Sequence, residues 1–276
     1  MTAQVPWLTI VTVVRDDTQG FLQTGYSLLA CEMDDVEWVV VDSSTGLESG
    51  RVRQFLEQIK IHSRYRWVEP LGIYSAMNDG LNIAIGRFIY FLNAGDRLHS
   101  PEQFSTVMSE LKQHPTPQWL VAQVNFHSSR KHDSETPDLD YFRERQAFFA
   151  RGKFPPHQGT IVQSDLLRSL HGFDLRYRVC ADYHLMLKVS QRSNPYISNA
   201  VLADFAPDGA STALWRTSIR EFHLARRSIY TFTPRSSAIE YLRTATHFLK
   251  LGSYQLWRRQ RSRFHPRGSR GPGAEA

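Results

Sequence analysis

The chain has little cysteine and no long apolar run, and both facts limit the classes of protein to which it can belong. Its two cysteines, Cys31 and Cys180, lie far apart, with no paired-cysteine motif or histidine cluster nearby. Neither a disulfide framework nor a zinc site is therefore indicated, and a reducing cytosol is the expected compartment. No apolar stretch approaches about 18 residues, which argues against a membrane-spanning helix. Residues 1–7 lack a basic segment followed by an apolar core, so we expect no secretory signal.

Acidic residues are fewer than basic ones, 27 against 33, which gives a formal net charge of +6. This balance suits a protein that handles anionic ligands such as nucleotide diphosphates, or one that lies on an anionic membrane surface. Nucleic acid would fit the charge equally well, but no nucleic-acid-binding motif is recognisable. The hydrophobic content of 41% is ordinary for a globular protein, and 276 residues can bury a sizeable core.

Strand and helix patterns alternate along the first half of the chain. The predicted strands cover 7–14, 37–41, 87–92 and 118–125, and the predicted helices cover 21–31, 50–60, 73–85 and 101–114. Strand, helix and strand in this order imply right-handed crossovers and a largely parallel sheet. Further on, Phe154-Pro-Pro leads into a short strand ending near residue 162, and an apolar helix face made by Leu185, Met186 and Val189 follows Asp182.

The stretch 69–96 is the part around which the chain is organised. Its apolar helical stripe is predicted to consist of Ile73, Met77, Leu81 and Ile85, before a stop at Gly86. A buried strand follows and ends at Asn93-Ala-Gly-Asp96. Because ligands collect at the carboxyl ends of strands in open α/β sheets, these amide and carboxylate oxygens suit a ribose or a hard cation. The competing interpretation is a simple turn that leads to a helix beginning at Pro101.

Asp42 comes directly after the second predicted strand, close to where Arg15 and Asp16 leave the first. A carboxylate in this place can accept hydrogen bonds from a base or a ribose. It can equally be a turn acid or a helix N-cap, both common at junctions between strands and helices.

The segments 72–80, 84–86 and 91–96 together resemble the core signature of family-2 glycosyltransferases, which have the GT-A fold. They read Gly-Ile-Tyr-Ser-Ala-Met-Asn-Asp-Gly, Ala-Ile-Gly and Phe-Leu-Asn-Ala-Gly-Asp. The closer similarity is to bacterial exopolysaccharide transferases of the colanic-acid type, and it covers 7–125 and 157–211. The resemblance implies an α/β protein with a Rossmann-like, mostly parallel sheet flanked by helices, and a helical basic C-terminal extension.

The resemblance also assigns site residues. It implies a donor site made by Arg15, Asp42, Asn78, Asn93 and Asp96. Asp96 would bind Mg²⁺ or Mn²⁺ together with the donor diphosphate, although the family motif often reads Asp-x-Asp-Asp and this chain keeps only its last acid. On the acceptor or diphosphate side the resemblance places His157, Gln158 and Ser211.

Asp182 lies in Ala-Asp-Tyr, ten residues after Gly172-Phe-Asp, in a pattern that resembles the family's general-base segment. The resemblance implies that Asp182 takes the proton of the acceptor hydroxyl as the bond to the anomeric carbon forms. The alternative is an acid that merely complements the dipole of the helix that follows it. The expected function is inverting transfer of a sugar from a nucleotide sugar to a hydroxyl of a glycan or lipid-linked acceptor, in bacterial polysaccharide biosynthesis.

The predicted organisation is a GT-A domain at 1–213, a helical basic extension at 214–265 and a disordered tail at 266–276. The donor half of the domain ends near residue 125, and the polar segment 127–140 is predicted to be a mobile loop or hairpin. The extension mixes aromatic residues with arginine, so it either lies on an anionic membrane or packs as a solvated helix. The expected location is the cytoplasm, free or on the inner face of the membrane.

Two other functions remain open at this point. A nucleotidyltransferase would carry a Gly-x-Gly-Thr-Arg loop after the first strand, where this chain has Val-Val-Arg-Asp-Asp. A non-catalytic GT-A-like assembly subunit would explain why acids of the family pattern are missing at positions 75, 93, 95 and 184. Retention of Asp42, Asp96 and Asp182 favours an enzyme. The donor base and sugar, the acceptor and the oligomeric state are not specified by the sequence.

Overall fold

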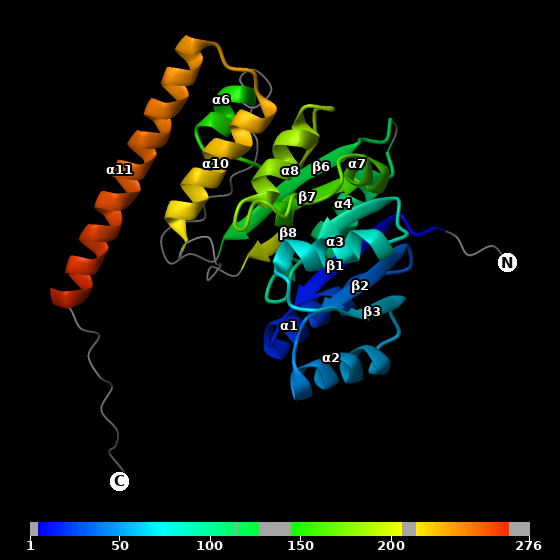
Figure 1. Ribbon diagram of the computed structural model, residues 1–276. Helices are drawn as coiled ribbons and strands as arrows, with labels where there is room; N and C mark the ends of the chain where they lie inside the picture. Colours follow the sequence, from blue (N-terminus) through cyan, green and yellow to red (C-terminus); the bar gives the residue numbers. More distant parts are fainter. Residues whose placement is uncertain (1–4, 114, 127–144, 206–213, 265–276) are drawn as a thin grey trace, which may run out of the picture.

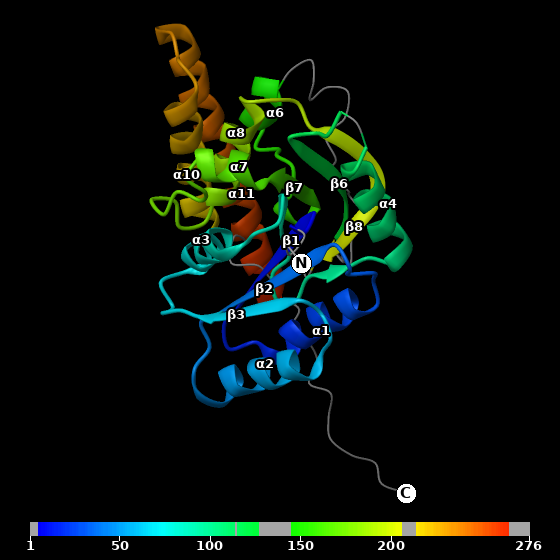
Figure 2. The ribbon, with the colours of Figure 1, turned by 90° about the vertical axis from the view of Figure 1, so that its right-hand side faces the viewer.

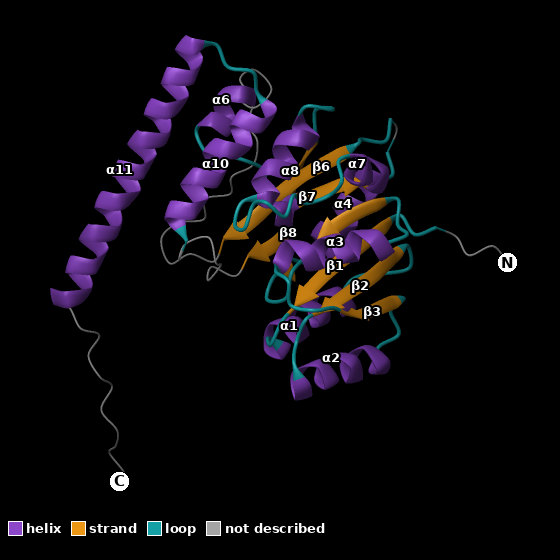
Figure 3. Cartoon of the chain, viewed as in Figure 1, coloured by secondary structure: helices purple, strands orange, loops and turns teal. Residues whose placement is uncertain are grey.

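The computed structural model describes residues 5–113, 115–126, 145–205 and 214–264 (Figure 1). Figure 3 separates its helices from its strands. In the first half the elements are β1 (Leu8–Val14), α1 (Thr18–Leu29), β2 (Val36–Asp42), α2 (Gly46–Gln58), β3 (Ser63–Trp67), α3 (Ile73–Ile83), β4 (Phe88–Phe91), β5 (Arg97–Leu98), α4 (Pro101–Leu111) and β6 (Trp119–Phe126). In the second half they are α6 (Arg145–Ala150), the 3₁₀-helix η1 (His157–Gly159), β7 (Thr160–Gln163), α7 (Ser164–Ser169), α8 (Ala181–Ser190), β8 (Tyr196–Phe205), α10 (Trp215–Ile229) and α11 (Pro234–Phe264).

The described strands form one eight-stranded sheet in the order β3-β2-β1-β4-β7-β6-β8-β5. The first four strands of this order are parallel, as are β6 and β8. β7 runs antiparallel to both of its neighbours, and β5 runs antiparallel to β8. The predicted α/β fold, with a mostly parallel sheet flanked by helices, is confirmed (Figure 2).

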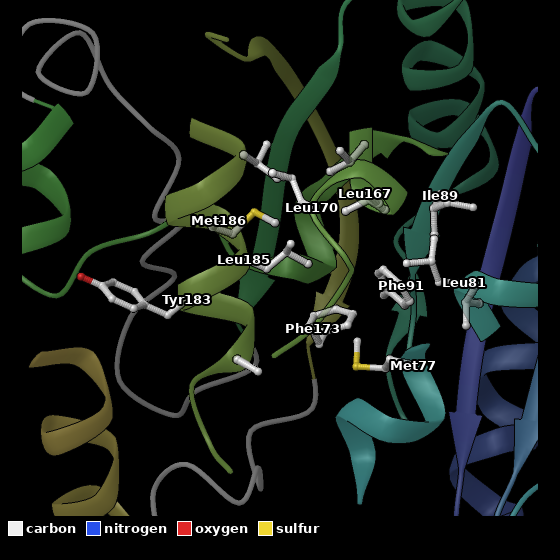
Figure 4. Close-up of a cluster of buried hydrophobic side chains, with 14 of the residues drawn as sticks. Met77, Leu81, Ile89, Phe91, Leu167, Leu170, Phe173, Tyr183, Leu185 and Met186 are labelled. Atoms are coloured by element: carbon white, nitrogen blue, oxygen red, sulfur yellow. The ribbon is translucent and has the colours of Figure 1, made fainter. Parts of the chain in front are cut away.

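Two hydrophobic clusters cover the two faces of the sheet, and β1 contributes to both in alternation. Leu8, Ile10 and Val14 join the side chains of α1, α2 and α4 in one cluster. Val11 and Val13 join those of α3, α7 and α8 in the other. Figure 4 shows part of this second cluster. Every residue of β1, β2 and β4 is buried, which is why these strands are rich in β-branched and aromatic residues.

The predicted apolar stripe of α3 is only half right. Met77 and Leu81 are buried, but Ile73 and Ile85 are 48% and 42% exposed. The helix begins at Ile73 and ends before Ile85, so neither side chain lies over the sheet. What brings the helix close to the sheet is Gly80, where a Cβ atom would lie 2.3 Å from Val11 Cγ1.

The predicted helical extension is present as α10 and α11. α10 packs on α8, and α11 packs on α10, so α10 lies between α8 and α11 (Figure 1). Among the described residues, no helix combines the length and apolar character needed to cross a bilayer. The predicted boundary near residue 213, the polar segment 127–140 and the tail 266–276 lie outside the described residues.

Candidate active site

Four side chains from four separate elements meet beside the carboxyl end of β4. Asn93 Nδ2 in the turn after β4 lies 3.3 Å from His157 Nε2 on η1. His157 Nδ1 in turn lies 3.6 Å from Asp182 Oδ2 on α8. The Tyr74 hydroxyl on α3 donates a hydrogen bond to Asp182 Oδ1 over 3.1 Å. Three of the predicted site residues are thus brought together, and Tyr74 joins them although it was not predicted as a site residue.

The two oxygens of the Asp182 carboxylate differ in their surroundings. Oδ1 accepts hydrogen bonds from the Tyr74 hydroxyl and, over 2.8 Å, from the backbone amide of Tyr183. Oδ2 faces the His157 ring, and 16% of the side chain is exposed. One oxygen therefore fixes the carboxylate, and the other stays available for a proton.

The two rings beside Asp182 are those of Tyr74 and His157. Burial raises the pKa of Tyr74, and the nearby Asp182 carboxylate adds to this effect, so its hydroxyl stays protonated. Asn93 Nδ2 lies within hydrogen-bond distance of His157 Nε2, so the other ring nitrogen, Nδ1, faces Asp182 Oδ2. Tyr74 therefore presents its hydroxyl hydrogen toward Oδ1, and the His157 ring lies beside Oδ2.

The turn Asn93-Ala-Gly-Asp96 is tied to α1 through Thr24. The Thr24 hydroxyl donates to the Asp96 carbonyl over 2.6 Å and accepts from the Gly95 amide over 3.1 Å. Gly95 has a φ of 95°, a conformation that glycine adopts without strain. Asp96 is only 4% exposed, and Asn93 Oδ1 is buried without a hydrogen-bond partner among the described residues. A buried oxygen without a partner, in the same turn as a buried carboxylate, is a suitable ligand for a cation.

These oxygens suit a metal ion that the substrate also binds, and not one enclosed entirely by protein side chains. The part of the chain that the structure describes contains no group of three or more His, Cys, Asp or Glu side chains that could enclose a metal ion. Asp96 and Asn93 Oδ1 can together supply at most two protein ligands. That suits Mg²⁺ or Mn²⁺ held largely by phosphate oxygens and water, as is usual at nucleotide sites.

Asp42 is fully buried, and both of its carboxylate oxygens have protein partners. Oδ1 accepts from the Ser44 amide over 2.7 Å, and Oδ2 accepts from the Tyr65 hydroxyl over 2.8 Å. The indole of Trp67 donates to the Ser44 carbonyl. Asp42 therefore shapes the loop between β2 and α2, and its contact with a donor stays a prediction. Arg15 is exposed at the same edge of the sheet.

Asn78 holds the backbone of Phe173 with both ends of its amide. Its Nδ2 donates to the Phe173 carbonyl, and its Oδ1 accepts from the Phe173 amide, each over 2.8 Å. The Phe173 ring packs against Phe91, with 5.0 Å between ring centroids (Figure 4). Asn78 thus fastens α3 to the segment that leads to α8. Its predicted place in the donor site remains a prediction beside this structural role.

We expect Asn78→Ala to lower the free energy of unfolding by about 2 kcal/mol, because it leaves the Phe173 amide and carbonyl without their partners. Urea unfolding of the variant and the wild type measures this loss. Donor titration of the same variant separates the two roles: unchanged affinity leaves Asn78 purely structural, whereas affinity weakened by about tenfold or more supports donor contact.

The remaining predicted residues have these positions. Gln158 is 6% exposed, and its carbonyl accepts from the Tyr90 hydroxyl, which places η1 against β4. Ser211 lies outside the described residues. His184, at a position where the family pattern has an acid, is 4% exposed and stacks on Tyr177. Burial lowers the pKa of His184 to about 4, so the ring is neutral at pH 7 and does not replace a second carboxylate.

Comparison with known proteins gives the class of the chain. No protein-family model matches it. An uncharacterized glycosyltransferase of Mycobacterium tuberculosis is 26% identical over 247 residues, which are 86% of this chain and 90% of that protein. A PGL/p-HBAD biosynthesis glycosyltransferase of Mycobacterium bovis is 28% identical over 124 residues, which are 45% of each chain.

Solved structures share the fold at lower identity. S. aureus TarS 1–349, whose complex with UDP-GlcNAc is also known, has a TM-score of 0.64 and 15% identity, covering 87% of this chain and 71% of its own. A mannosyltransferase from Pyrobaculum calidifontis in complex with GDP-Man and Mn²⁺ has a TM-score of 0.60 and 17% identity, covering 91% and 76%.

The fold is that of GT-A glycosyltransferase structures. The expected class of enzyme, a glycosyltransferase, is confirmed by the curated relatives together with this fold. Membership of family 2 and the colanic-acid resemblance stay predictions.

Proposed function

We propose that the chain is an inverting glycosyltransferase that moves a sugar from a nucleotide-sugar donor to a hydroxyl of a glycan or lipid-linked acceptor in bacterial polysaccharide biosynthesis. The observation that carries this proposal is the Asp182 carboxylate, fixed through Oδ1 by Tyr74 and the Tyr183 amide, with Oδ2 directed toward His157. A general base needs a fixed, partly exposed carboxylate within hydrogen-bond reach of the hydroxyl that reacts.

The reaction proceeds in one displacement. The acceptor oxygen forms a bond to the anomeric carbon, and its proton passes to Asp182 Oδ2. The bond from the anomeric carbon to the diphosphate oxygen breaks, and its electron pair leaves with the nucleoside diphosphate. Attack opposite to the leaving group inverts the configuration. His157 lies beside the receiving oxygen, 3.6 Å from Nδ1 to Oδ2, where it can orient the acceptor hydroxyl.

The donor side of the site is formed by the turn after β4 and the loops after β1 and β2. Asp96 and Asn93 Oδ1 would hold a divalent cation, which when bound stabilises negative charge on the leaving diphosphate. Arg15 and Asp42 would contact the nucleoside at the same edge of the sheet, and the His157 side faces the acceptor. The complex of the P. calidifontis mannosyltransferase with GDP-Man and Mn²⁺ supports a donor bound with a metal.

Asp96→Ala is expected to weaken donor binding by about tenfold or more, because a carboxylate ligand of the cation is lost. Calorimetric titration of UDP-, GDP- and dTDP-sugars with Mn²⁺ measures this, and the wild type should bind one nucleotide class. Asp35→Ala, which removes an acid that pairs with Lys112 on the surface, is the control and should bind as the wild type does. A folded wild type that binds no donor would favour the non-catalytic assembly subunit.

A membrane-bound acceptor is supported by an uneven distribution of charge. Residues 214–264 contain eleven Arg and Lys residues but only two acids, whereas residues 1–213 contain 20 basic and 24 acidic residues. The two acids, Glu221 and Glu240, are both buried. The outer side of α10 and α11 therefore presents cations together with exposed apolar side chains such as Leu242 and Leu249. We propose that this surface holds the enzyme on an anionic membrane.

Replacing Arg216, Arg220 and Arg243 by Gln should weaken binding to anionic vesicles. At about 1 kcal/mol for each basic residue near the surface, the affinity should fall by roughly two orders of magnitude. Cosedimentation with phosphatidylcholine vesicles, with and without phosphatidylglycerol, measures the effect. The control replaces Arg51, Arg53 and Lys60, three exposed cations in and just after α2, and should bind normally. Equal binding by both triple variants would rule out this membrane surface.

A further inference from the structure

A single buried carboxylate on α10 binds three successive backbone amides just before α8. Glu221 Oε1 accepts a hydrogen bond from the amide of Arg178, and Glu221 Oε2 accepts from those of Val179 and Cys180, each over 2.9 Å. Glu221 is only 7% exposed. The predicted extension is thus bonded directly to the segment that leads to the general base.

These three amides depend on Glu221 for their partners. The amide groups at and before the start of a helix have no carbonyl partner within it, and a buried N–H that lacks an acceptor is costly. Hydrogen bonds to a carboxylate are stronger than those between neutral groups. The buried charge of Glu221 is in turn compensated by the amides, so the side chain and the segment hold each other in place.

The same segment is held from the opposite side by α3. The single hydrogen of the Tyr74 hydroxyl is shared between the Val179 carbonyl, 2.7 Å away, and Asp182 Oδ1, 3.1 Å away. Val179 is therefore fixed through its amide by Glu221 and through its carbonyl by Tyr74. Because Asp182 is the second residue of α8, the position of its carboxylate follows from where this segment places the start of the helix.

We infer that Glu221 is a positioning residue for the reaction: it fixes the backbone of residues 178–180 and thereby the orientation of Asp182. This inference rests on the proposed role of Asp182 as the base. It makes α10 part of the catalytic unit, whereas the sequence predicts an extension outside the GT-A domain. Glu221 itself is separated from the reacting atoms and acts only through the backbone.

The test is Glu221→Gln in the full chain. Glutamine keeps one acceptor oxygen, but its NH₂ group cannot accept a hydrogen bond from a backbone amide. Glu221→Gln therefore loses part of the set of three hydrogen bonds to residues 178–180. We expect amide hydrogen exchange of residues 178–180 and of Tyr183 to accelerate by about tenfold or more. For hydrolysis of the nucleotide sugar that calorimetry identifies, the kcat of Glu221→Gln should be about tenfold lower than that of the wild type. Its donor affinity should be unchanged within about twofold. Glu221→Asp, which keeps the charge on a shorter side chain, should show the same pattern and serves if the Gln variant is unfolded.

His223→Gln is the matched control. His223 lies two residues further along α10 but bonds to Thr244 of α11, so its loss should lower stability without changing exchange at 178–180 or kcat. Wild-type exchange at Tyr183 in the Glu221 variants would overturn the inference, as would faster exchange with unchanged kcat. A wild type that binds no donor would refute the proposed function instead, and exchange would still decide whether Glu221 fixes the start of α8.

Discussion

Asp182→Asn is expected to lower kcat by about 10²- to 10⁴-fold, the usual contribution of a general base, while donor affinity stays within about twofold. Asparagine retains an oxygen that can accept from the Tyr74 hydroxyl and the Tyr183 amide, so the side chain keeps its place. It cannot take up the proton of the acceptor hydroxyl. Release of the nucleoside diphosphate, followed alongside calorimetric donor binding, separates the loss of chemistry from a loss of binding.

The control for this experiment is Asp165→Asn, which changes a fully exposed carboxylate on α7 and should leave kcat unchanged. Wild-type activity of Asp182→Asn would remove the base from the mechanism. Asp182 would then be an acid that complements the dipole of α8, the alternative that the sequence left open.

Glu240→Leu should destabilise the protein by about 3–5 kcal/mol, because it leaves the charge of Arg226 buried without its partner. Arg226 and Glu240 are 3% and 2% exposed, and Arg226 Nε lies 2.7 Å from Glu240 Oε1. The pair joins α10 to α11, and Arg226 also donates to the Tyr183 hydroxyl. Urea unfolding followed by circular dichroism measures the loss.

Two further variants show whether the loss comes from an unpaired charge. Arg226→Met combined with Glu240→Leu removes both charges and should recover most of the stability. Lys112→Met, which breaks the exposed pair with Asp35, should cost no more than about 1 kcal/mol. A double variant as unstable as Glu240→Leu would mean that packing, and not the unpaired charge, explains the effect.

The strands that could be predicted from the sequence are those buried on both faces. β1, β2 and β4 are rich in β-branched and aromatic residues because helices cover them on each side. β3 was missed because it is an edge strand whose side chains are mostly exposed, with Arg64 and Arg66 among them. β8 was missed as well: its buried and exposed residues are mixed, and its pairing with β6 joins segments about 80 residues apart, which no local pattern reveals.

For the site, the sequence alone identified candidate acids but not their companions. Only the family resemblance assigned Asn93, His157 and Asp182 to one site. They lie far apart in the sequence, where helix or strand periodicity cannot show that side chains meet. Tyr74 lies inside the recognised segment 72–80, yet its role becomes visible only from its bonds to Val179 and Asp182. No sequence pattern indicated a role for Glu221, because its partners are backbone amides, which are present in every sequence.

The strand order has a consequence for how the enzyme is made. The four parallel strands β3, β2, β1 and β4 come from one continuous stretch, residues 8–91, and need nothing that follows them to pair. The strand next to them, β7, and the helix that carries Asp182 come from the second half of the chain. Since domains tend to fold from the N-terminus during synthesis, the donor half should be built early. The enzyme would then become active only after residue 221 has left the ribosome. A measurement of activity would therefore detect only chains that have completed folding.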